Sequence, residues 1–289
     1  MKKIIITHVG AWNTKEGDVQ NTEKILAENA AIEGMKEENT EEMTVKAVSF
    51  LENAPELDAG TGSILQIDGC CRMDSAIADS ERGYAGILQI ENIKNPALVA
   101  KRLLQYGYHS ILSGKGAQAF ALEEGLELAN VITESRWQQY TEKRKLIPDP
   151  LYRNLATNQK ALNEKKLGTV GAVALADGRL TAVSSTGGLA FGYPGRVGDT
   201  AIFGAGIFCN KDVAVTCTGE GDKILQMMLA LKVWLYYKEN QNLQLSTQKA
   251  IEELYKDYNA QSGVIALSRR GETAVAFSTS FLATKILEQ

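Results

Sequence analysis

The sequence predicts an α+β fold in which two β-sheets stack on each other and helices cover their outer faces. Two observations lead to this prediction. Helical and strand patterns come in groups, with a polar segment between them, and do not show the βαβα alternation of a single parallel sheet. At 289 residues the chain is long enough to bury a large core.

The first half begins with a β-rich run at residues 3–7 that predicts a strand, and turn-forming residues follow at 9–13. Apolar residues at helical spacing predict two helices, and Pro55 ends the second. Pro96 predicts the start of another helix, because its missing N–H costs nothing there. The predicted elements are helices at 21–33, 40–52, 96–106 and 117–125, and strands at 3–7, 63–68, 72–78 and 85–89.

Residues 133–168 change in character and predict a mobile, charged linker. Polar side chains dominate there, apolar periodicity is weak, and Pro148-Asp149-Pro150 interrupts the segment. Short strands rich in small apolar residues follow it. The predicted elements are strands at 169–175, 180–185, 201–208, 213–217, 263–268 and 273–278, and helices at 222–237 and 247–258.

Composition and charge exclude several classes of function. A formal net charge of -4 provides no basic surface for nucleic acid. No segment approaches the ~18 apolar residues that suggest a membrane span, and the apolar run near the amino terminus is too short for a signal peptide. Four cysteines are too few for a disulfide scaffold in a chain of this length. We therefore expect a cytoplasmic protein that binds neither nucleic acid nor membrane.

The most informative segment is Gly168-Thr169-Val170-Gly171, at the end of the charged segment. If the chain is cut between Gly168 and Thr169, Thr169 carries a free α-amine beside its own hydroxyl. An α-amine has a pKa near ~7.7–8.0, so it can take the proton of a hydroxyl that is inert alone at neutral pH. The segment thus predicts a nucleophile and its base in one residue.

Glycine-rich segments at 184–188, 195–199, 204–206 and 218–222 follow this junction. Thr218 and Gly219 lie at a predicted strand end before a helix, where free N–H groups can hold a developing oxyanion. Arg196 and Asp199 can bind a zwitterion together: the Arg196 guanidinium pairs with the ligand's carboxylate, and the Asp199 carboxylate pairs with its ammonium group. Taken singly, the glycines are better explained by tight turns, and Arg196 and Asp199 by a surface ion pair. Their joint presence behind the Gly-Thr junction favours a site.

Together these motifs resemble the plant-type asparaginase and isoaspartyl-peptidase family of N-terminal-nucleophile hydrolases, which includes the glycosylasparaginases. The resemblance covers nearly the whole chain. Its strongest pieces are 168–175, 185–188, 194–199, 204–206 and 217–219 with Gly221, and its weaker pieces are 55–60, 73–76, 95–96 and 116–117. It implies a four-layer αββα sandwich with two mostly antiparallel sheets. It also implies self-cleavage of this single domain into an α chain, residues 1–168, and a β chain, residues 169–289.

The resemblance further implies roles for the site residues. Thr169 would be the nucleophile, Thr186 would position its amine, and Thr218 and Gly219 would form the oxyanion hole. Arg196 would bind the substrate α-carboxylate, and Asp199 and the Gly221 carbonyl would bind the substrate α-amine. No organic cofactor is implied. Residues 51–61 match the family's sodium loop, whose implied ligands are the backbone carbonyls of Leu51, Glu52, Ala54, Leu57, Ala59 and Thr61. Carbonyl oxygens suit an alkali cation; a helix C-terminal turn without an ion is the alternative.

Three departures from the family pattern stand out. Asp58 occupies the position of an asparagine, and a carboxylate there raises the pKa of the Thr169 amine, pairs with a neighbouring cation, or carries protons. Val9 replaces a glycine and stiffens a loop near the amino terminus. Glu220 adds an acidic group beside the predicted oxyanion hole. The chemistry needs neither histidine, so we interpret His8 and His109 as structural or surface groups.

The sequence thus predicts a self-activated amidohydrolase that cleaves the side-chain amide of L-asparagine and of β-aspartyl peptides and releases L-aspartate. We expect small-molecule or dipeptide substrates and a dimer of αβ heterodimers. One alternative is an N4-(β-N-acetylglucosaminyl)-L-asparaginase, although Gly187-Gly188 and the form of the Gly-Thr junction favour the asparaginase branch. The other is a catalytically weak or silent homologue that acts as a binding protein, with Asp58 and Glu220 spoiling the site.

Overall fold

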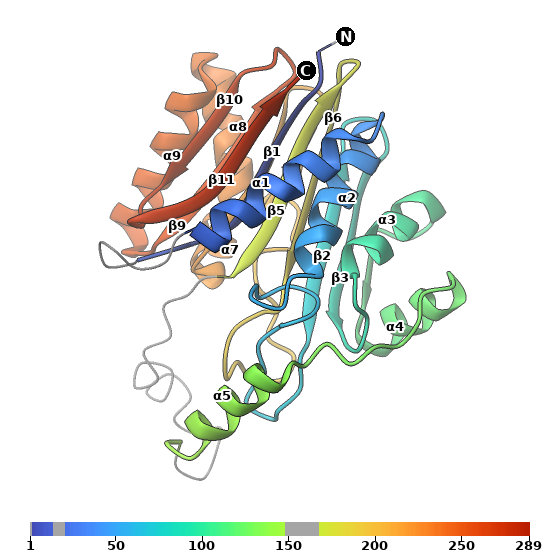
Figure 1. The fold of residues 1–289 in the computed structure, drawn as a ribbon. Helices are drawn as coiled ribbons and strands as arrows, with labels where there is room; N and C mark the ends of the chain where they lie inside the picture. The colour runs from blue at the N-terminus through green and yellow to red at the C-terminus, as the bar shows by residue number, and fades with distance from the viewer. Residues whose placement is uncertain (1, 14–20, 148–167) are drawn as a thin grey trace.

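Two β-sheets lie face to face in the centre of the computed structural model, which describes residues 2–13, 21–147 and 168–289 (Figure 1). Within these residues, one sheet has seven strands in the order β11-β1-β5-β6-β2-β3-β4, and the other has four in the order β10-β9-β8-β7. Neighbouring strands run antiparallel except for β3 and β4, which are parallel. The strands are β1 (Ile4–Trp12), β2 (Met73–Asp79), β3 (Gly83–Ile90), β4 (Ile111–Ser113), β5 (Thr169–Ala176), β6 (Arg179–Thr186), β7 (Ile207–Cys209), β8 (Val213–Gly219), β9 (Ser262–Ser268), β10 (Thr273–Phe277) and β11 (Phe281–Glu288).

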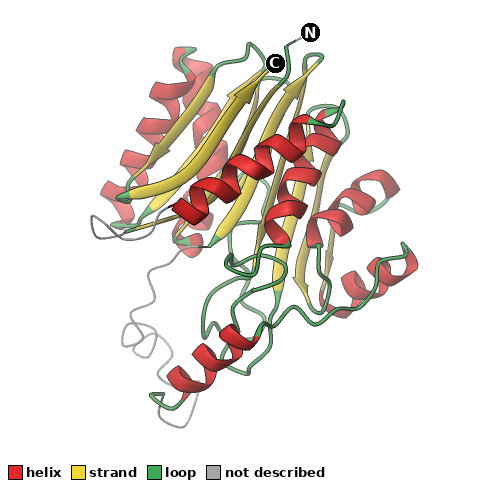
Figure 2. Cartoon of the chain, viewed as in Figure 1, coloured by secondary structure: helices red, strands yellow, loops and turns green. Residues whose placement is uncertain are grey.

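Helices cover the outer face of each sheet (Figure 2). The helices between residues 21 and 123 pack on the seven-stranded sheet, and those between residues 221 and 258 pack on the four-stranded sheet. The helices are α1 (Asn21–Met35), α2 (Thr40–Glu52), α3 (Pro96–Tyr106), α4 (Gly114–Glu123), α5 (Glu134–Arg144), α7 (Gly221–Met227), α8 (Leu229–Asn240) and α9 (Leu243–Tyr258). A separate apolar core fills each helix–sheet interface and the space between the sheets. The predicted four-layer α+β sandwich is therefore confirmed.

Central strand β5 is buried along its whole length, since α2 packs against the sheet on one side and β8 on the other. A strand covered on both faces needs apolar or small side chains throughout. This requirement explains why the run after Gly168 lacks the polar–apolar alternation of a half-exposed strand. It also places Thr169, at the first position of β5, between the two sheets.

Several predicted elements differ from the observed ones because loop hydrogen bonds compete with regular structure. Residues 63–68, predicted as a strand, form turns in which the Ile67 amide donates to the Gly192 carbonyl. Residues 201–206 form turns that return to the Asp199 carbonyl, so only β7 remains of that predicted strand. The predicted helix 222–237 is divided at Met228, which adopts a left-handed conformation with φ 57°. Strands β4 and β11 were not predicted.

Part of the predicted linker is helical. Helix α5 begins after Thr133, whose side chain accepts a hydrogen bond from the Arg136 amide. The Tyr140 ring stacks on Phe191 with centroids 5.4 Å apart, and its hydroxyl donates to the Ile67 carbonyl. The helix has no fully buried residue, so its sequence lacks apolar periodicity, and these contacts with other loops hold it in place. Residues 148–167 of the predicted linker lie outside the described residues.

All four cysteines are free. Among the helices that the structure describes, none combines the length and the hydropathy that crossing a lipid bilayer would require.

Candidate active site

Strands β5 and β6 bring two of the predicted catalytic threonines together. Thr169 lies directly opposite Thr186 in the antiparallel pairing, and both residues are buried. The Thr186 hydroxyl donates to the Gly168 carbonyl over 3.4 Å and accepts a hydrogen bond from the Gly188 amide over 3.1 Å. A hydroxyl donor thus contacts the carbonyl of the peptide bond that precedes Thr169.

A further threonine lies at the same place. The Thr200 hydroxyl oxygen is 3.5 Å from that of Thr169, and Thr200 is 1% exposed. Thr200 is not among the residues predicted from the sequence. Its position beside Asp199, in the loop that also carries Arg196, is the signal that points to it.

Strand β8 carries the predicted oxyanion hole and faces β5 and β6 across the sheets. The Thr218 side chain is buried, and its hydroxyl has no hydrogen-bond partner within the described residues. Gly219 has φ 145°, and a Cβ atom there would lie 2.5 Å from the Gln261 carbonyl oxygen, so this position requires glycine. The Glu220 carboxylate accepts a hydrogen bond from the Gln261 amide over 2.8 Å, and this bond directs it toward the start of β9.

The residues predicted to bind the substrate's charged groups also come together. A Cβ atom on Gly221 would lie 2.5 Å from Asp199 Oδ1 and 3.1 Å from Arg196 Nη2. The Arg196 guanidinium forms an ion pair with Asp222, N to O 3.0 Å. Asp199 Oδ2 is buried and has no hydrogen-bond partner in the described part of the chain. A guanidinium and an unsatisfied carboxyl oxygen therefore border a space that only glycine leaves open.

The electrostatics of Asp199 follow from its burial. Desolvation raises its pKa to about 7, and the nearby charge of Arg196 opposes this rise. A substrate ammonium group would supply the positive charge that the buried carboxylate needs. Asp199 is thus suited to bind a cationic ligand group above neutral pH.

Asp74 and Gln89 hold the Arg196 loop. Asp74 lies opposite Thr186 in the pairing of β2 with β6, and its Oδ1 accepts a hydrogen bond from the Gln89 amide over 2.8 Å. The Gln89 side-chain amide donates to the Arg196 carbonyl over 2.8 Å. Burial raises the pKa of Asp74. No sequence motif indicates Gln89, because its role depends on the contact between β3 and a distant loop.

Asp58 lies directly against the Gly168–Thr169 junction. A Cβ atom on Gly168 would lie 2.4 Å from the Cβ of Asp58, and one on Gly187 would lie 2.0 Å from Asp58 Oδ1. The Asp58 carbonyl accepts a hydrogen bond from the Gly187 amide, and its Oδ1 accepts one from the Ile64 amide. Both glycines therefore leave room for this side chain.

The loop at residues 51–61 closes through a hydrogen bond from the Thr61 amide to the Glu52 carbonyl over 2.8 Å. The Leu51 and Ala54 carbonyls accept hydrogen bonds from amides within the loop, and the Leu57 carbonyl accepts one from Arg136. Each of these oxygens retains a second lone pair. Neutral carbonyl oxygens on a looped backbone therefore fit an alkali cation as donors.

The Glu52 side chain connects this loop to the strand that carries Thr186. Its carboxyl group is fully buried and accepts hydrogen bonds from Ser185 Oγ over 2.6 Å and from the Ala97 amide over 3.0 Å. Burial raises the pKa of Glu52 to about 7, although these hydrogen bonds favour its charged form.

His8 is a buried neighbour of the nucleophile strand. It pairs with Gly171, and a Cβ atom on Gly171 would lie 2.4 Å from His8 Nε2. Burial lowers the pKa of His8 to about 3, and the nearby Thr169 backbone opposes this shift. The imidazole is therefore neutral near pH 7, which agrees with a structural role, whereas His109 is exposed.

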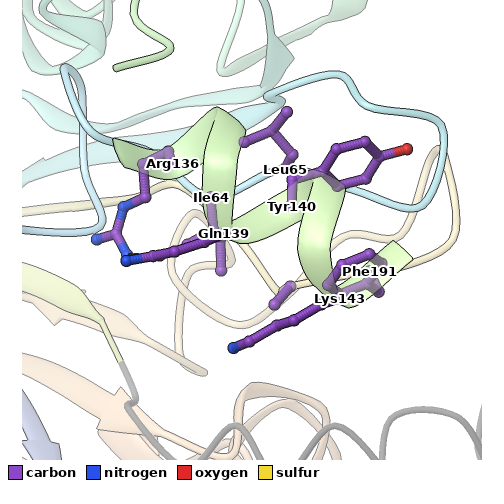
Figure 3. A pocket seen from close by; sticks show the side chains of 8 residues that line it. Ile64, Leu65, Arg136, Gln139, Tyr140, Lys143 and Phe191 are labelled. Atoms are coloured by element: carbon purple, nitrogen blue, oxygen red, sulfur yellow. Dashed lines mark hydrogen bonds between the residues drawn. The ribbon is translucent and has the colours of Figure 1, made fainter. Parts of the chain in front are cut away.

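A separate small cavity lies beside α5 (Figure 3), with a volume of about 20 Å³. It is lined by Ile64, Leu65, Arg136, Gln139, Tyr140, Lys143, Ala190 and Phe191. This volume suits about one water molecule and is too small for an amino acid. The constellation around Thr169 is the better candidate for a catalytic site.

Comparison with known proteins agrees with this geometry. A family model described as asparaginase matches residues 1–289. The isoaspartyl peptidase/L-asparaginase of Synechocystis is 37% identical over 233 residues, which cover 80% of this chain and 70% of that protein. The plant-type L-asparaginase of Pyrococcus horikoshii is 33% identical over 288 residues, covering 96% of this chain and 94% of that protein. The isoaspartyl peptidase of Escherichia coli is 32% identical over 294 residues, covering 96% of this chain and 90% of that protein. The chain described here belongs to the asparaginase family.

Proposed function

We propose that this chain is a threonine-nucleophile amidohydrolase that activates itself by cleavage between Gly168 and Thr169. Its substrates are L-asparagine and β-aspartyl peptides, and its product is L-aspartate. The main support is the hydroxyl of Thr169 at the junction, with Thr186 on the preceding carbonyl and the Arg196–Asp199 pair nearby. The names of the relatives, isoaspartyl peptidase and plant-type L-asparaginase, support the same substrates.

In the first stage, the Thr169 hydroxyl attacks the Gly168 carbonyl carbon and the peptide nitrogen leaves as the α-amine of Thr169. Water then hydrolyses the resulting ester and frees the hydroxyl. The hydrogen bond from Thr186 to the Gly168 oxygen, 3.4 Å long, supports the charge that develops on this oxygen.

In the second stage, the freed amine takes the hydroxyl proton as Thr169 attacks the side-chain carbonyl of the substrate. Arg196 holds the substrate α-carboxylate, while Asp199 and the Gly221 carbonyl hold its ammonium group. Thr218 and Gly219 stabilise the oxyanion, and the loss of one such donor costs ~3 kcal/mol. Ammonia or an amine leaves, and water releases aspartate from the acyl-enzyme.

Intact mass measurement of the wild-type chain and of Thr169→Ala tests this function. The wild type should separate into two chains that together account for 31.4 kDa, and the variant should stay whole and hydrolyse neither substrate. Thr169→Ser keeps a hydroxyl and an amine, so it is the matched control and should still be cleaved. Hydrolysis by Thr169→Ala would contradict the proposed nucleophile.

The same preparation separates the two alternatives. Turnover of β-aspartyl dipeptides and asparagine, compared with glycosyl-asparagine, distinguishes this function from that of a glycosylasparaginase. A wild-type chain that stays whole after long incubation at neutral pH, and hydrolyses none of the three, would favour a silent binding protein.

The proposal extends to the ion, the assembly and the compartment. Carbonyls of Leu51, Glu52, Ala54, Leu57, Ala59 and Thr61 would hold a sodium ion, which would rigidify the loop that carries Asp58. Replacing sodium chloride with choline chloride at equal ionic strength should then lower the melting temperature. Sedimentation should give a dimer of αβ heterodimers, and we propose a cytoplasmic location.

A further inference from the structure

A second cavity, with a volume of about 270 Å³, lies at the opposite end of strand β5 from Thr169. Its walls come from the turn between β5 and β6, the turn between β9 and β10, and the segment just before β1. Figure 1 shows both chain termini at this end of the sandwich, away from the end where β5 begins. The cavity is therefore separate from the proposed active site, and turns of both sheets form it. It is lined by Lys2, Leu175, Asp177, Gly178, Arg269 and Arg270.

Positive charge dominates the lining of this cavity, which we call the basic cavity. Three of its side chains are cationic and one is anionic, in a chain whose formal net charge is -4. Lys2 forms an exposed ion pair with Glu288, N to O 3.1 Å. The guanidinium groups of Arg269 and Arg270 form no hydrogen bond or ion pair with the residues that the structure describes. Both guanidinium groups therefore remain available to a ligand.

Hydrogen bonds fix the β9–β10 turn that carries both arginines. Ser268 Oγ donates to Glu272 Oε2 over 2.9 Å and accepts from the Glu272 amide over 3.1 Å. The Arg269 amide donates to the Asp212 carbonyl over 2.9 Å. The Asp212 carboxylate accepts a hydrogen bond from Trp234 Nε1 over 2.9 Å instead of pairing with Arg269. The turn thus presents its two cations from a fixed backbone.

Two glycines let the cations of the basic cavity lie across neighbouring turns. A Cβ atom on Gly178 would lie 3.6 Å from Arg269 Nη2, so the Arg269 guanidinium lies over the β5–β6 turn. A Cβ atom on Gly271 would lie 3.4 Å from Lys2 Nζ, so the Lys2 ammonium lies over the β9–β10 turn. Positive groups from different parts of the chain therefore converge where the ends of the two sheets meet.

The chemistry of the lining selects the class of ligand. The planar guanidinium group has donors that match pairs of oxygens on a phosphate or a carboxylate. Two guanidinium groups and an ammonium group favour an anion with two charges over one with a single charge. The volume of about 270 Å³ lies below the ~300–1,000 Å³ of pockets that hold drug-sized ligands. The basic cavity thus suits a small dianion.

We propose that the basic cavity binds a phosphate group, with Arg269 and Arg270 as its main partners and Lys2 as a third cation. This site goes beyond the proposed function and uses none of the residues that carry it. A bound phosphate bridges turns of the two sheets and stabilises the folded chain, because it binds only where these turns meet. Asp177 repels the ligand and weakens its binding.

Calorimetric titration with inorganic phosphate tests the site. It is done at about pH 8, where a phosphate group carries nearly two charges, and at constant ionic strength. Arg269→Gln and Arg270→Gln should each weaken binding about tenfold, as for the loss of a charge-assisted hydrogen bond. Arg102→Gln removes an exposed arginine from α3 and is the matched control, which should bind as wild type does. Absence of saturable binding to wild type, or equal affinities of these four proteins, would overturn the proposal.

Asp177→Asn provides a test in the opposite direction. Removing the negative charge should strengthen phosphate binding about twofold or more, as expected for one exposed charge. Asp177 has φ 52°, and asparagine adopts this left-handed conformation readily, so the variant keeps the turn. Weaker binding by Asp177→Asn would contradict the electrostatic basis of the site.

Arg196 offers phosphate a competing position, because it is the carboxylate-binding group of the proposed active site. Arg196→Gln should leave phosphate affinity unchanged. Lost binding in Arg196→Gln, with normal binding in Arg269→Gln, would place the anion at the active site and overturn the proposal. These titrations need neither cleavage nor turnover, so they test the basic cavity even if the proposed function is wrong.

Three further measurements identify the anion and its effect. Methyl phosphate that binds as tightly as inorganic phosphate would support the terminal phosphate of a metabolite as the ligand, and weaker binding would support free phosphate. Acetate that binds as tightly as phosphate would overturn the preference for a dianion. Phosphate should raise the melting temperature of wild type more than that of Arg269→Gln, at the ionic strength of a chloride control. An equal rise in both proteins would contradict binding at this cavity.

Discussion

The hydroxyl oxygens of Thr169 and Thr200 lie 3.5 Å apart between the two sheets. Thr200 follows Asp199, so one loop provides both a buried carboxyl group and the hydroxyl group that contacts the proposed nucleophile. This contact connects the strand that begins at Thr169 with the loop that binds the substrate amine in our proposal.

We predict that Thr200→Val slows both self-cleavage and substrate hydrolysis. Valine keeps the shape of threonine but removes the hydroxyl that fixes the orientation of Thr169. The loss of one such hydrogen bond is worth about 1 kcal/mol, which corresponds to about fivefold in rate. Steady-state kinetics and intact mass measure the two effects. Thr200→Ser is the control, and a Thr200→Val enzyme as fast as the control would contradict the role.

A second prediction concerns the close approach at Gly221. A Cβ atom there would lie 2.5 Å from Asp199 Oδ1 and 3.1 Å from Arg196 Nη2. Gly221→Ala should therefore displace the two groups that hold the substrate's charged ends. We expect KM for L-asparagine to rise about tenfold or more, as for the loss of a charge-assisted hydrogen bond of about 1.5–3 kcal/mol. Self-cleavage, which uses no free substrate, should change much less. An equal loss in both reactions would show that the alanine disturbs the whole site.

The sequence predicted the α+β class and most strands because β-rich runs and helical periodicity are local signals. Helix α2 was predicted with its observed bounds from helical spacing and Pro55, and the structure shows that the Asn39 side chain caps its start. Strand β11 was missed because its polar residues lie on an edge strand, where one face is partly exposed. The break at Met228 was missed because it accompanies contacts with a distant loop: the Ala230 and Leu231 amides donate to the carbonyls of Ala205 and Gly204.

The predicted site residues come from distant parts of the chain and meet only in the folded structure. The Gly168-Thr169 junction, the glycine-rich loop at 195–199 and the resemblance indicated Thr169, Arg196 and Asp199, and the fold brings them together. The contact of Arg136 with the Leu57 carbonyl could not be predicted in the same way, because Arg136 lies in a polar segment without periodicity and its partner is a backbone oxygen. A backbone carbonyl leaves no signature in residue types.

A third prediction follows from the buried carboxyl of Asp199. Its pKa is about 7 when folded, against an ordinary value of 3.8. Between these values the unfolded chain binds fewer protons than the folded one, so this group's contribution to stability is complete below pH 3.8 and is lost as pH rises through about 7. Asp199→Asn should remove this decline in the free energy of unfolding. Denaturant melts of both proteins at several pH values measure it, and parallel curves would contradict the assignment.

The same carboxyl should control substrate binding in the opposite sense. Because the ionised form holds the substrate ammonium, KM for L-asparagine should rise as pH falls below about 7. In Asp199→Asn, KM should be higher and nearly independent of pH in this range. The Thr169 amine acts in the chemical step, so its ionisation should appear in kcat instead. Separate pH profiles of kcat and KM distinguish the two groups.

The last prediction concerns Glu52, whose buried side chain accepts hydrogen bonds from Ser185 Oγ and the Ala97 amide. Glu52→Ala leaves both donors without their acceptor and opens a cavity, so the free energy of unfolding should fall by about 2–4 kcal/mol. Glu52→Gln keeps an acceptor oxygen of the same shape and avoids burying a charge, so it should lose much less. Ser185 precedes Thr186, and the alanine variant should therefore also slow self-cleavage in the fraction that remains folded. Thermal melts and intact mass of both variants measure these effects. If glutamine and alanine destabilise the protein equally, the acceptor role of Glu52 is wrong, and its charge is what the fold requires.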